Sequence, residues 1–432
     1  MDLFDQLRGV FGIAVLLSIA WAISEDRSGR PGWRWITGAL VLQGALALVI
    51  VRVPFVWDLM AYANEGVSAI ERATLDGSSY MFGYLGGAPL PFELKEGGDA
   101  PLIIAFQILP LVIVFSALAA VLWHWGVLKW LVNGLSFLLR RTLGVSGVVG
   151  LSGGANMFLG VVESPLVVRA YFAKMSRAEL FQVMVLAMST ISGAILILYA
   201  TTLRDTVDDA VGHMISASLV SLPAALLIAK LMVPGRPDDT ATETGPEAGA
   251  EGEDVSLKYD SSIDAIVKGT MDGMQLFLAV IAVIIVVFAL VSLTDQILAL
   301  LPLVGEEPLT LKRIFGWLFA PLMWAIGVPW AEAQAAGGIM GTKAILNEYV
   351  AYLELAALPE GTFSPRSLLI VTYAVCGVAN LASVGLLVST IGTLCPERRA
   401  EAAGLGMKSW IAGNIATAMT GAWIGLVTFG SV

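Results

Sequence analysis

Two glutamates stand in stretches of the sequence that are otherwise apolar. Glu163 lies in GGANMFLGVVESPLVVR, and Glu348 lies in GTKAILNEYVAYLEL. A carboxylate at membrane depth costs several kcal/mol by most estimates, so it is rarely present without a task. Both residues are therefore candidates for binding a solute or an ion.

Each glutamate is followed by an apolar helical stretch that small polar residues interrupt. The first reads MVLAMSTISGAILILY and is interrupted around Thr190, and the second reads VTYAVCGVANLASVGLLVST and is interrupted around Asn380. Small residues at one such break could serve only close helix packing. Two breaks, each following a buried acid in matching halves of the chain, indicate the binding site of a secondary transporter instead.

The composition predicts the elements that must position these residues. The chain is 57% apolar and 14% charged, and it contains many uncharged runs long enough to cross a bilayer of about 30 Å. We expect an all-α polytopic membrane protein. The predicted spans are 9–24, 36–51, 101–128, 180–203, 210–229, 273–294, 367–394 and 409–431.

Two further segments, 142–168 and 314–358, are rich in glycine and carry the two glutamates. Irregular backbone at membrane depth is tolerated where it lines a cavity, so each is expected to form a re-entrant hairpin. Eight spans place most Lys and Arg residues on the cytoplasmic side when both termini face out. The two hairpins then enter from opposite sides, as an inverted repeat requires.

The chain divides into four predicted regions. Residues 1–140 hold the first spans and an interfacial helix within 55–98, and residues 141–233 hold the first hairpin, its broken helix and the next span. Residues 234–262 are expected to be a disordered cytoplasmic linker, because seven acids and no base lie between Asp238 and Asp254. Residues 263–432 hold a scaffold span, the second hairpin, the second broken helix and the last span.

No motif for ATP hydrolysis, dinucleotide binding or covalent catalysis is present. An intramembrane enzyme that uses Glu163 and Glu348 as acid and base is disfavoured, because neither residue has a nucleophile or a metal partner nearby in the sequence. Transport would draw its energy from an ion gradient. No cofactor and no nucleic-acid partner are expected.

Several segments, in the same order, resemble the bacterial concentrative nucleoside transporters. They are GGANMFLGVVESPLVVR, SSIDAIVKGTMDGMQL, FAPLMWAIGVPW, GTKAILNEYVAY and YAVCGVANLASVG. The resemblance covers residues from about 100 to the carboxyl terminus. It implies an inner-membrane homotrimer whose subunits each contain eight spans, two opposed hairpins and a transport domain that moves like an elevator.

The resemblance also implies the roles of particular residues. Glu348, Asn380 and Ser383 match the positions that hold the ribose hydroxyls, and a carboxylate suits that task because it can accept from two vicinal hydroxyls. Ile195 is also expected among the residues that bind the substrate. The sodium site of the family maps to Asn156, Leu159, Thr190 and Ile191, an all-oxygen set when backbone carbonyls are included.

The base-binding positions depart from the family. Where its members usually carry Gln-Thr or Gln-Ser before the first glutamate, this chain has Val161 and Val162, and a frequent phenylalanine is replaced by Val378. Glu163 remains available to contact the base. The substrate is thus expected to be a nucleoside or a close ribosylated relative, carried with Na⁺. Proton coupling, and a gate-like membrane protein that conducts or senses a different solute, remain the alternatives.

Overall fold

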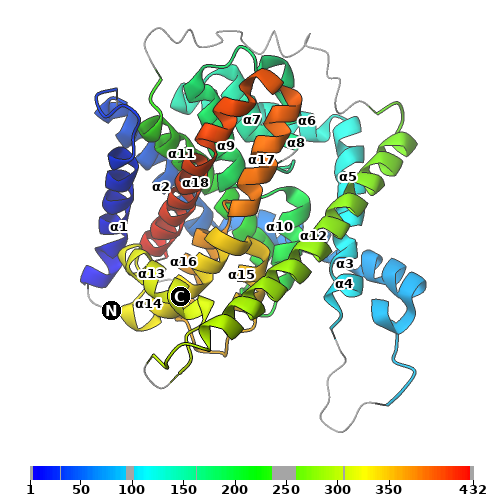
Figure 1. The fold of residues 1–432 in the computed structure, drawn as a ribbon. Helices are drawn as coiled ribbons and strands as arrows, with labels where there is room; N and C mark the ends of the chain where they lie inside the picture. Colours follow the sequence, from blue (N-terminus) through cyan, green and yellow to red (C-terminus); the bar gives the residue numbers. More distant parts are fainter. Residues whose placement is uncertain are drawn as a thin grey trace.

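The computed structural model describes residues 3–29, 31–93, 102–161, 163–235, 259–304 and 307–428. Within these ranges the regular structure is helical, apart from one isolated β-bridge between Val304 and Glu307 (Figure 1). The helices before the acidic segment are α1 (Leu3–Ala22), α2 (Trp33–Arg52), α3 (Pro54–Phe82), α4 (Ile104–Gln107), α5 (Pro110–His124), α6 (Val127–Leu143), α7 (Gly147–Asn156), α8 (Glu163–Val167), α9 (Arg177–Ser189), α10 (Gly193–Thr202) and α11 (Ala210–Met232). Those after it are α12 (Ser262–Leu298), α13 (Leu311–Ala325), α14 (Trp330–Gly341), α15 (Glu348–Ala356), α16 (Pro365–Val375), α17 (Leu381–Leu394) and α18 (Arg399–Val427).

Each of the eight predicted spans corresponds to helix in the structure. Six continuous or gently bent helical stretches among the described residues are long and apolar enough to cross a membrane. The two remaining predicted spans are α1, whose apolar part is short, and the pair α16 and α17, each of which is short because the helix is broken between them. The predicted class of all-α polytopic membrane protein is therefore confirmed.

The first predicted hairpin is formed by α7 and α8, within the expected segment 142–168. The second is shorter than the expected 314–358, because residues 311–325 form the separate helix α13. A bend of 119° divides α13 from α14. Gly327 has a φ of +121°, a conformation that glycine adopts without strain, and it ends α13 here. The second hairpin therefore begins at Trp330.

The two halves of the molecule repeat the same order of elements. An amphipathic helix is followed by a hairpin, a broken helix and a long helix: α6, α7 with α8, α9 with α10, and α11 in the first half, and α13, α14 with α15, α16 with α17, and α18 in the second. The sequence analysis included neither α6 nor α13 as a separate element. The repeat places the two breaks at equivalent positions in the two halves.

The helix predicted within 55–98 occupies residues 54–82 as α3, and residues 94–98 lie outside the described ranges. Most of the predicted linker also lies outside them. Helix α1 begins and α18 ends on the same side of the molecule (Figure 1). This arrangement agrees with an even number of crossings.

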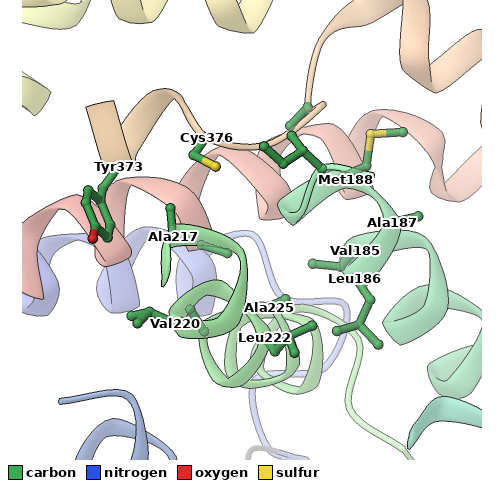
Figure 2. Close-up of a cluster of buried hydrophobic side chains, with 14 of the residues drawn as sticks. Val185, Leu186, Ala187, Met188, Ala217, Val220, Leu222, Ala225, Tyr373 and Cys376 are labelled. Carbon is green, nitrogen blue, oxygen red and sulfur yellow. The ribbon is translucent and has the colours of Figure 1, made fainter. Parts of the chain in front are cut away.

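The core forms around α9, α11 and α18. In the apolar windows of the α9–α10 pair and of α11, 83% of the residues are buried. Figure 2 shows side chains of α9 and α11 packing beside Tyr373 and Cys376, at the end of α16. The end of α16, just before the second break, thus packs against helices that are themselves largely buried.

Helix α12 behaves differently, since none of its apolar window is buried within this chain. It runs beside α5 (Figure 1), and a Cβ added at Gly269 or Gly273 would come within 3 Å of α5 atoms. Small residues spaced by four positions allow such a close approach between membrane helices. From Leu276 onward the exposed side chains of α12 are mostly apolar.

Candidate functional site

The two helix breaks lie against each other in the middle of the molecule. Helix α9 ends at Ser189 and α10 begins at Gly193, while α16 ends at Val375 and α17 begins at Leu381. Gly377 has a φ of +156°, and a Cβ added there would lie 3.1 Å from the carbonyl oxygen of Met188 and 2.7 Å from a methyl carbon of Thr417. A side chain at this position would separate the breaks, so glycine is required for their contact.

Each broken helix begins after a serine that caps its first turn. Ser176 forms a capping box with Glu179 at the start of α9. Ser364 accepts from the backbone N–H of Ser367 at the start of α16. These caps satisfy free backbone donors and fix where each broken helix starts.

Glu348 is the first residue of α15 and is 5% exposed. The Tyr199 hydroxyl on α10 donates to its Oε1 at 2.6 Å, and Asn380 Nδ2 donates to its Oε2 at 2.6 Å. Each carboxylate oxygen can accept more than one hydrogen bond. One acceptor site on each oxygen is occupied by the protein, which orients the carboxylate and leaves further acceptor capacity.

Asn380 is the N-cap of α17 and is 1% exposed. Its Oδ1 accepts from the backbone N–H of Ser383 at 2.8 Å, so its Nδ2 faces Glu348. The break in the second helix therefore supplies a side chain that caps the next helical segment and orients the glutamate of the second hairpin.

A cavity of about 310 Å³ opens beside Glu348. Its wall is mostly apolar, with a few polar groups, as in binding sites for small molecules. The hairpins and broken helices contribute Asn156, Phe158, Leu159, Gly160, Val161, Thr190, Ser192, Gly193, Ala194, Ile195, Leu198, Tyr199, Asn347, Glu348, Tyr349, Val378, Ser383 and Leu386. The opposite wall comes from α5 and α12 and includes the carboxylate of Asp272.

The first hairpin contacts the first break. Asn156, 2% exposed, donates from Nδ2 to the Leu186 carbonyl at 2.9 Å and contacts the Thr190 hydroxyl, while its Oδ1 accepts from the Ser164 hydroxyl at 2.8 Å. The backbone N–H of Gly193 donates to the Phe158 carbonyl at 3.3 Å. The residues expected for an ion site are thereby brought together at the hairpin tip.

The structure brings most of the predicted site residues to one cavity. Those that line it are Asn156, Leu159, Val161, Thr190, Ile195, Glu348, Val378 and Ser383. Ile191 and Asn380 are buried and are not among the lining residues. Val162 lies outside the described residues, and of Glu163 the structure describes only the backbone at the start of α8.

Three residues that contact the predicted set were missed by the sequence analysis. Tyr199 donates to Glu348, Ser164 donates to Asn156, and Asn347 caps α15 by accepting from the Tyr349 N–H at 2.7 Å. Tyr199 is a polar aromatic residue in an apolar helix, and Ser164 and Asn347 flank the two glutamates directly. Their positions in the sequence were the available signal.

Comparison with known proteins decides the family. Family models match residues 11–85 as the N-terminus and 213–425 as the C-terminus of the Na⁺-dependent nucleoside transporters, and a nucleoside recognition (Gate) model matches 105–206. YutK of Bacillus subtilis, an uncharacterized transporter, is 33% identical over 98% of this chain and 99% of its own length. The nucleoside permease NupC of Helicobacter pylori is 30% identical and is covered, like this chain, over 98% of its length. The chain belongs to the Na⁺-dependent nucleoside transporter family.

A solved structure agrees with this membership. CNTnw in an inward-facing, substrate-bound state matches with a TM-score of 0.86 and 33% identity, covering 98% of this chain and 97% of that chain. The resemblance to concentrative nucleoside transporters is confirmed. This member of the family is a multi-pass membrane transporter and not an enzyme.

Proposed function

We propose that this transporter carries nucleosides into the cell together with Na⁺ and recognises the ribose through Glu348. The observation that carries the proposal is the carboxylate itself, held by Tyr199 and Asn380 at 2.6 Å each on the wall of the cavity. Its remaining acceptor capacity suits two vicinal hydroxyls, which both donate. The nucleoside permease among the relatives supports the same solute class.

Ser383 is the second proposed ribose contact, because its side chain lines the cavity one helical turn after Asn380. Asn380 acts mainly on the glutamate, since both ends of its amide already have protein partners. A ribose in this place would meet a charged acceptor, a hydroxyl and the ring of Tyr349.

The base is proposed to lie toward the first hairpin. Val161 and Val378 present aliphatic groups to the cavity there, so this part of the wall offers fewer hydrogen bonds to the polar edge of a base. Glu163 remains the candidate for a contact to a ring nitrogen or an amino group. We therefore expect weak discrimination among bases compared with discrimination for the ribose.

Na⁺ is proposed to bind between Asn156 and Thr190, with the carbonyls of Leu159 and Ile191. The amide nitrogen of Asn156 now faces Thr190 and the Leu186 carbonyl. A half-turn of the amide exchanges nitrogen and oxygen; the hydrogen bond to Leu186 is then lost, and the ion has to separate Oδ1 from that carbonyl oxygen. The Ser164 hydroxyl can then accept from Nδ2 while Oδ1 faces the ion. Oxygen ligands of this kind suit a hard cation.

The arrangement in the membrane is also a proposal. Both termini face outward from the plasma (inner) membrane, and the moving unit consists of the hairpins and broken helices. The long exposed apolar helix α12 supports a homotrimer in which α5 and α12 form the fixed scaffold.

Uptake of radiolabelled nucleosides into proteoliposomes tests the proposal. The parent protein should accumulate nucleoside with an inward Na⁺ gradient, and purine and pyrimidine nucleosides should compete better than free bases or ribose. Accumulation that ignores Na⁺ but disappears with a protonophore would replace Na⁺ by H⁺ as the coupling ion. Failure of every nucleoside to enter or compete would refute the solute assignment.

A further inference from the structure

Lys343 is completely buried, although it carries an ammonium group. It lies in the π-helical turn 342–346 that connects α14 to the segment before Glu348. A lysine is almost never fully buried unless its charge is compensated, because removing the ammonium from water is costly. π-Helical turns are also frequent at functional sites. Neither the ribose contacts nor the ion site uses this side chain.

The ammonium of Lys343 binds two side chains of α18. Nζ donates to Asn414 Oδ1 at 2.8 Å and to Thr417 Oγ1 at 3.0 Å. Because the ammonium only donates, it requires the oxygen of the Asn414 amide to face it. The nitrogen of that amide must then point the other way.

Asn414 Nδ2 reaches the break in the second broken helix. It donates to the backbone carbonyl of Ala379 at 3.0 Å and to that of Trp410 at 2.9 Å. Trp410 Nε1 in turn donates to the carbonyl of Ala344, the residue after Lys343, at 2.7 Å. The π-helical turn, α18 and the break are therefore joined by a continuous set of hydrogen bonds.

This set of hydrogen bonds ends beside the carboxylate of Glu348, the proposed ribose acceptor. Asn380 follows Ala379 directly and donates to Glu348 at 2.6 Å. Lys343 and Glu348 belong to the same hairpin, so the hairpin holds the break through two connections, one by way of Asn414 and one by way of Asn380. The side chains of Lys343 and Glu348 also carry opposite charges. Because both residues belong to the second hairpin, any movement of this hairpin carries the two side chains together.

We propose that Lys343 is a positioning residue for ribose recognition: through Asn414 it fixes the backbone before Asn380, and thereby the orientation of Glu348. The inference rests on the proposed ribose role of Glu348. Lys343 itself does not touch the substrate. Its loss should weaken the contacts to the ribose hydroxyls more than those to any other part of the nucleoside.

Lys343→Met tests the proposal with a pair of ligands. The best-transported nucleoside of the parent is compared with its 2′,3′-dideoxy analogue, by competition against uptake in proteoliposomes. We expect the variant to bind the ribonucleoside about tenfold more weakly, the change expected for one misaligned charge-assisted hydrogen bond. Affinity for the dideoxy analogue should change less than about twofold, since that ligand lacks the hydroxyls that Glu348 accepts from.

Lys230→Met is the matched control. Lys230 is a half-buried lysine of α11 whose ammonium lies 4.2 Å from the centroid of the Trp35 ring, away from the substrate cavity. Lys230→Met should leave unchanged the ratio of the affinity for the ribonucleoside to that for its dideoxy analogue. An equal loss for both ligands in Lys343→Met would show that Lys343 acts only on general stability and would overturn the proposal.

Asn414→Ala approaches the same connection from the other side and serves if Lys343→Met does not fold. It should reduce ribonucleoside affinity selectively, and the double variant should be no weaker than the weaker single variant, because both remove one connection. Additive losses, or an unchanged ligand ratio in Asn414→Ala, would overturn the proposal. A parent that transports no nucleoside at all refutes the proposed function instead, which the parent measurement alone reveals.

Discussion

Replacing Glu348 by glutamine is the most direct test of how this transporter holds its solute. The substitution keeps the size of the side chain and removes its charge. Asn380 Nδ2 donates to one carboxylate oxygen and is fixed in that direction by its own cap to Ser383. Two amide nitrogens cannot face each other favourably, so the new amide must turn its oxygen to Asn380 and its nitrogen to Tyr199.

The expected loss follows from this orientation. The oxygen that faces Asn380 can still accept from one ribose hydroxyl, but the nitrogen on the Tyr199 side cannot accept from the other. Losing a hydrogen bond to a charged group is worth about 1.5 to 3 kcal/mol, or roughly 10- to 150-fold in affinity. Uptake at low nucleoside concentration should therefore nearly disappear in a protein that remains folded.

The assay is nucleoside uptake in proteoliposomes over a range of substrate concentrations, with thermal unfolding in detergent as the check on folding. Tyr199→Phe is the matched variant, because it removes one partner of Glu348 and leaves the charge, and its loss should be smaller. A Glu348→Gln protein with the affinity and rate of the parent would refute the ribose assignment. In both variants, the affinity for a 2′,3′-dideoxynucleoside should fall much less than the affinity for the ribonucleoside.

Three further outcomes are expected. Asn156→Ala should raise the Na⁺ concentration for half-maximal uptake, because it removes a side-chain oxygen from a site at a buried hairpin tip; an unchanged Na⁺ dependence would exclude this residue as a ligand. Val161→Gln combined with Val378→Phe should strengthen competition by uridine about tenfold relative to the parent. The reason is that a new hydrogen bond contributes about 0.5 to 1.5 kcal/mol and the phenylalanine ring adds packing surface. An unchanged ranking of uridine, adenosine and inosine would place these residues away from the base. The bidentate contact with Arg177 and the ammonium of Lys408 lower the pKa of Glu25 from 4.5 to about 2. The ionised carboxylate therefore contributes to stability above about pH 4.5, and this contribution declines as the pH falls toward 2. Thermal unfolding of Glu25→Gln should depend less on pH below about pH 5 than that of the parent, and an identical pH dependence would contradict this contribution.

The sequence predicted the class, the spans and several residues that the structure places around one cavity, because each left a local pattern. Uncharged runs marked the spans, and small polar residues marked the two breaks. Glu348 and the break at Asn380 were linked because both halves of the chain show the same order, an acid followed by a broken helix, and the structure joins the two residues by a hydrogen bond. Only the recognition of the family, and not the spacing, assigned them to a ribose.

Other features could not be predicted because their partners are distant in the sequence. Tyr199 and Glu348 are 149 positions apart, and nothing around either residue indicates the other. Helix α13 was merged with the second hairpin because both are apolar and rich in small residues, and composition does not locate a bend. Lys343 was passed over because a lysine in a membrane protein is ordinarily placed near water, whereas here α18 supplies acceptors for it at depth.

The contact between the two breaks has a thermodynamic consequence. Thr190 belongs to the first break, and Tyr199, on the helix that follows it, donates to the glutamate of the second hairpin. An ion bound at the proposed site in the first break would therefore act on the geometry of the proposed ribose acceptor. Linkage makes this effect reciprocal at equilibrium: whatever factor Na⁺ adds to nucleoside affinity, the nucleoside must add to Na⁺ affinity. If both solutes bind where proposed, each would stabilise the form of the site that retains the other.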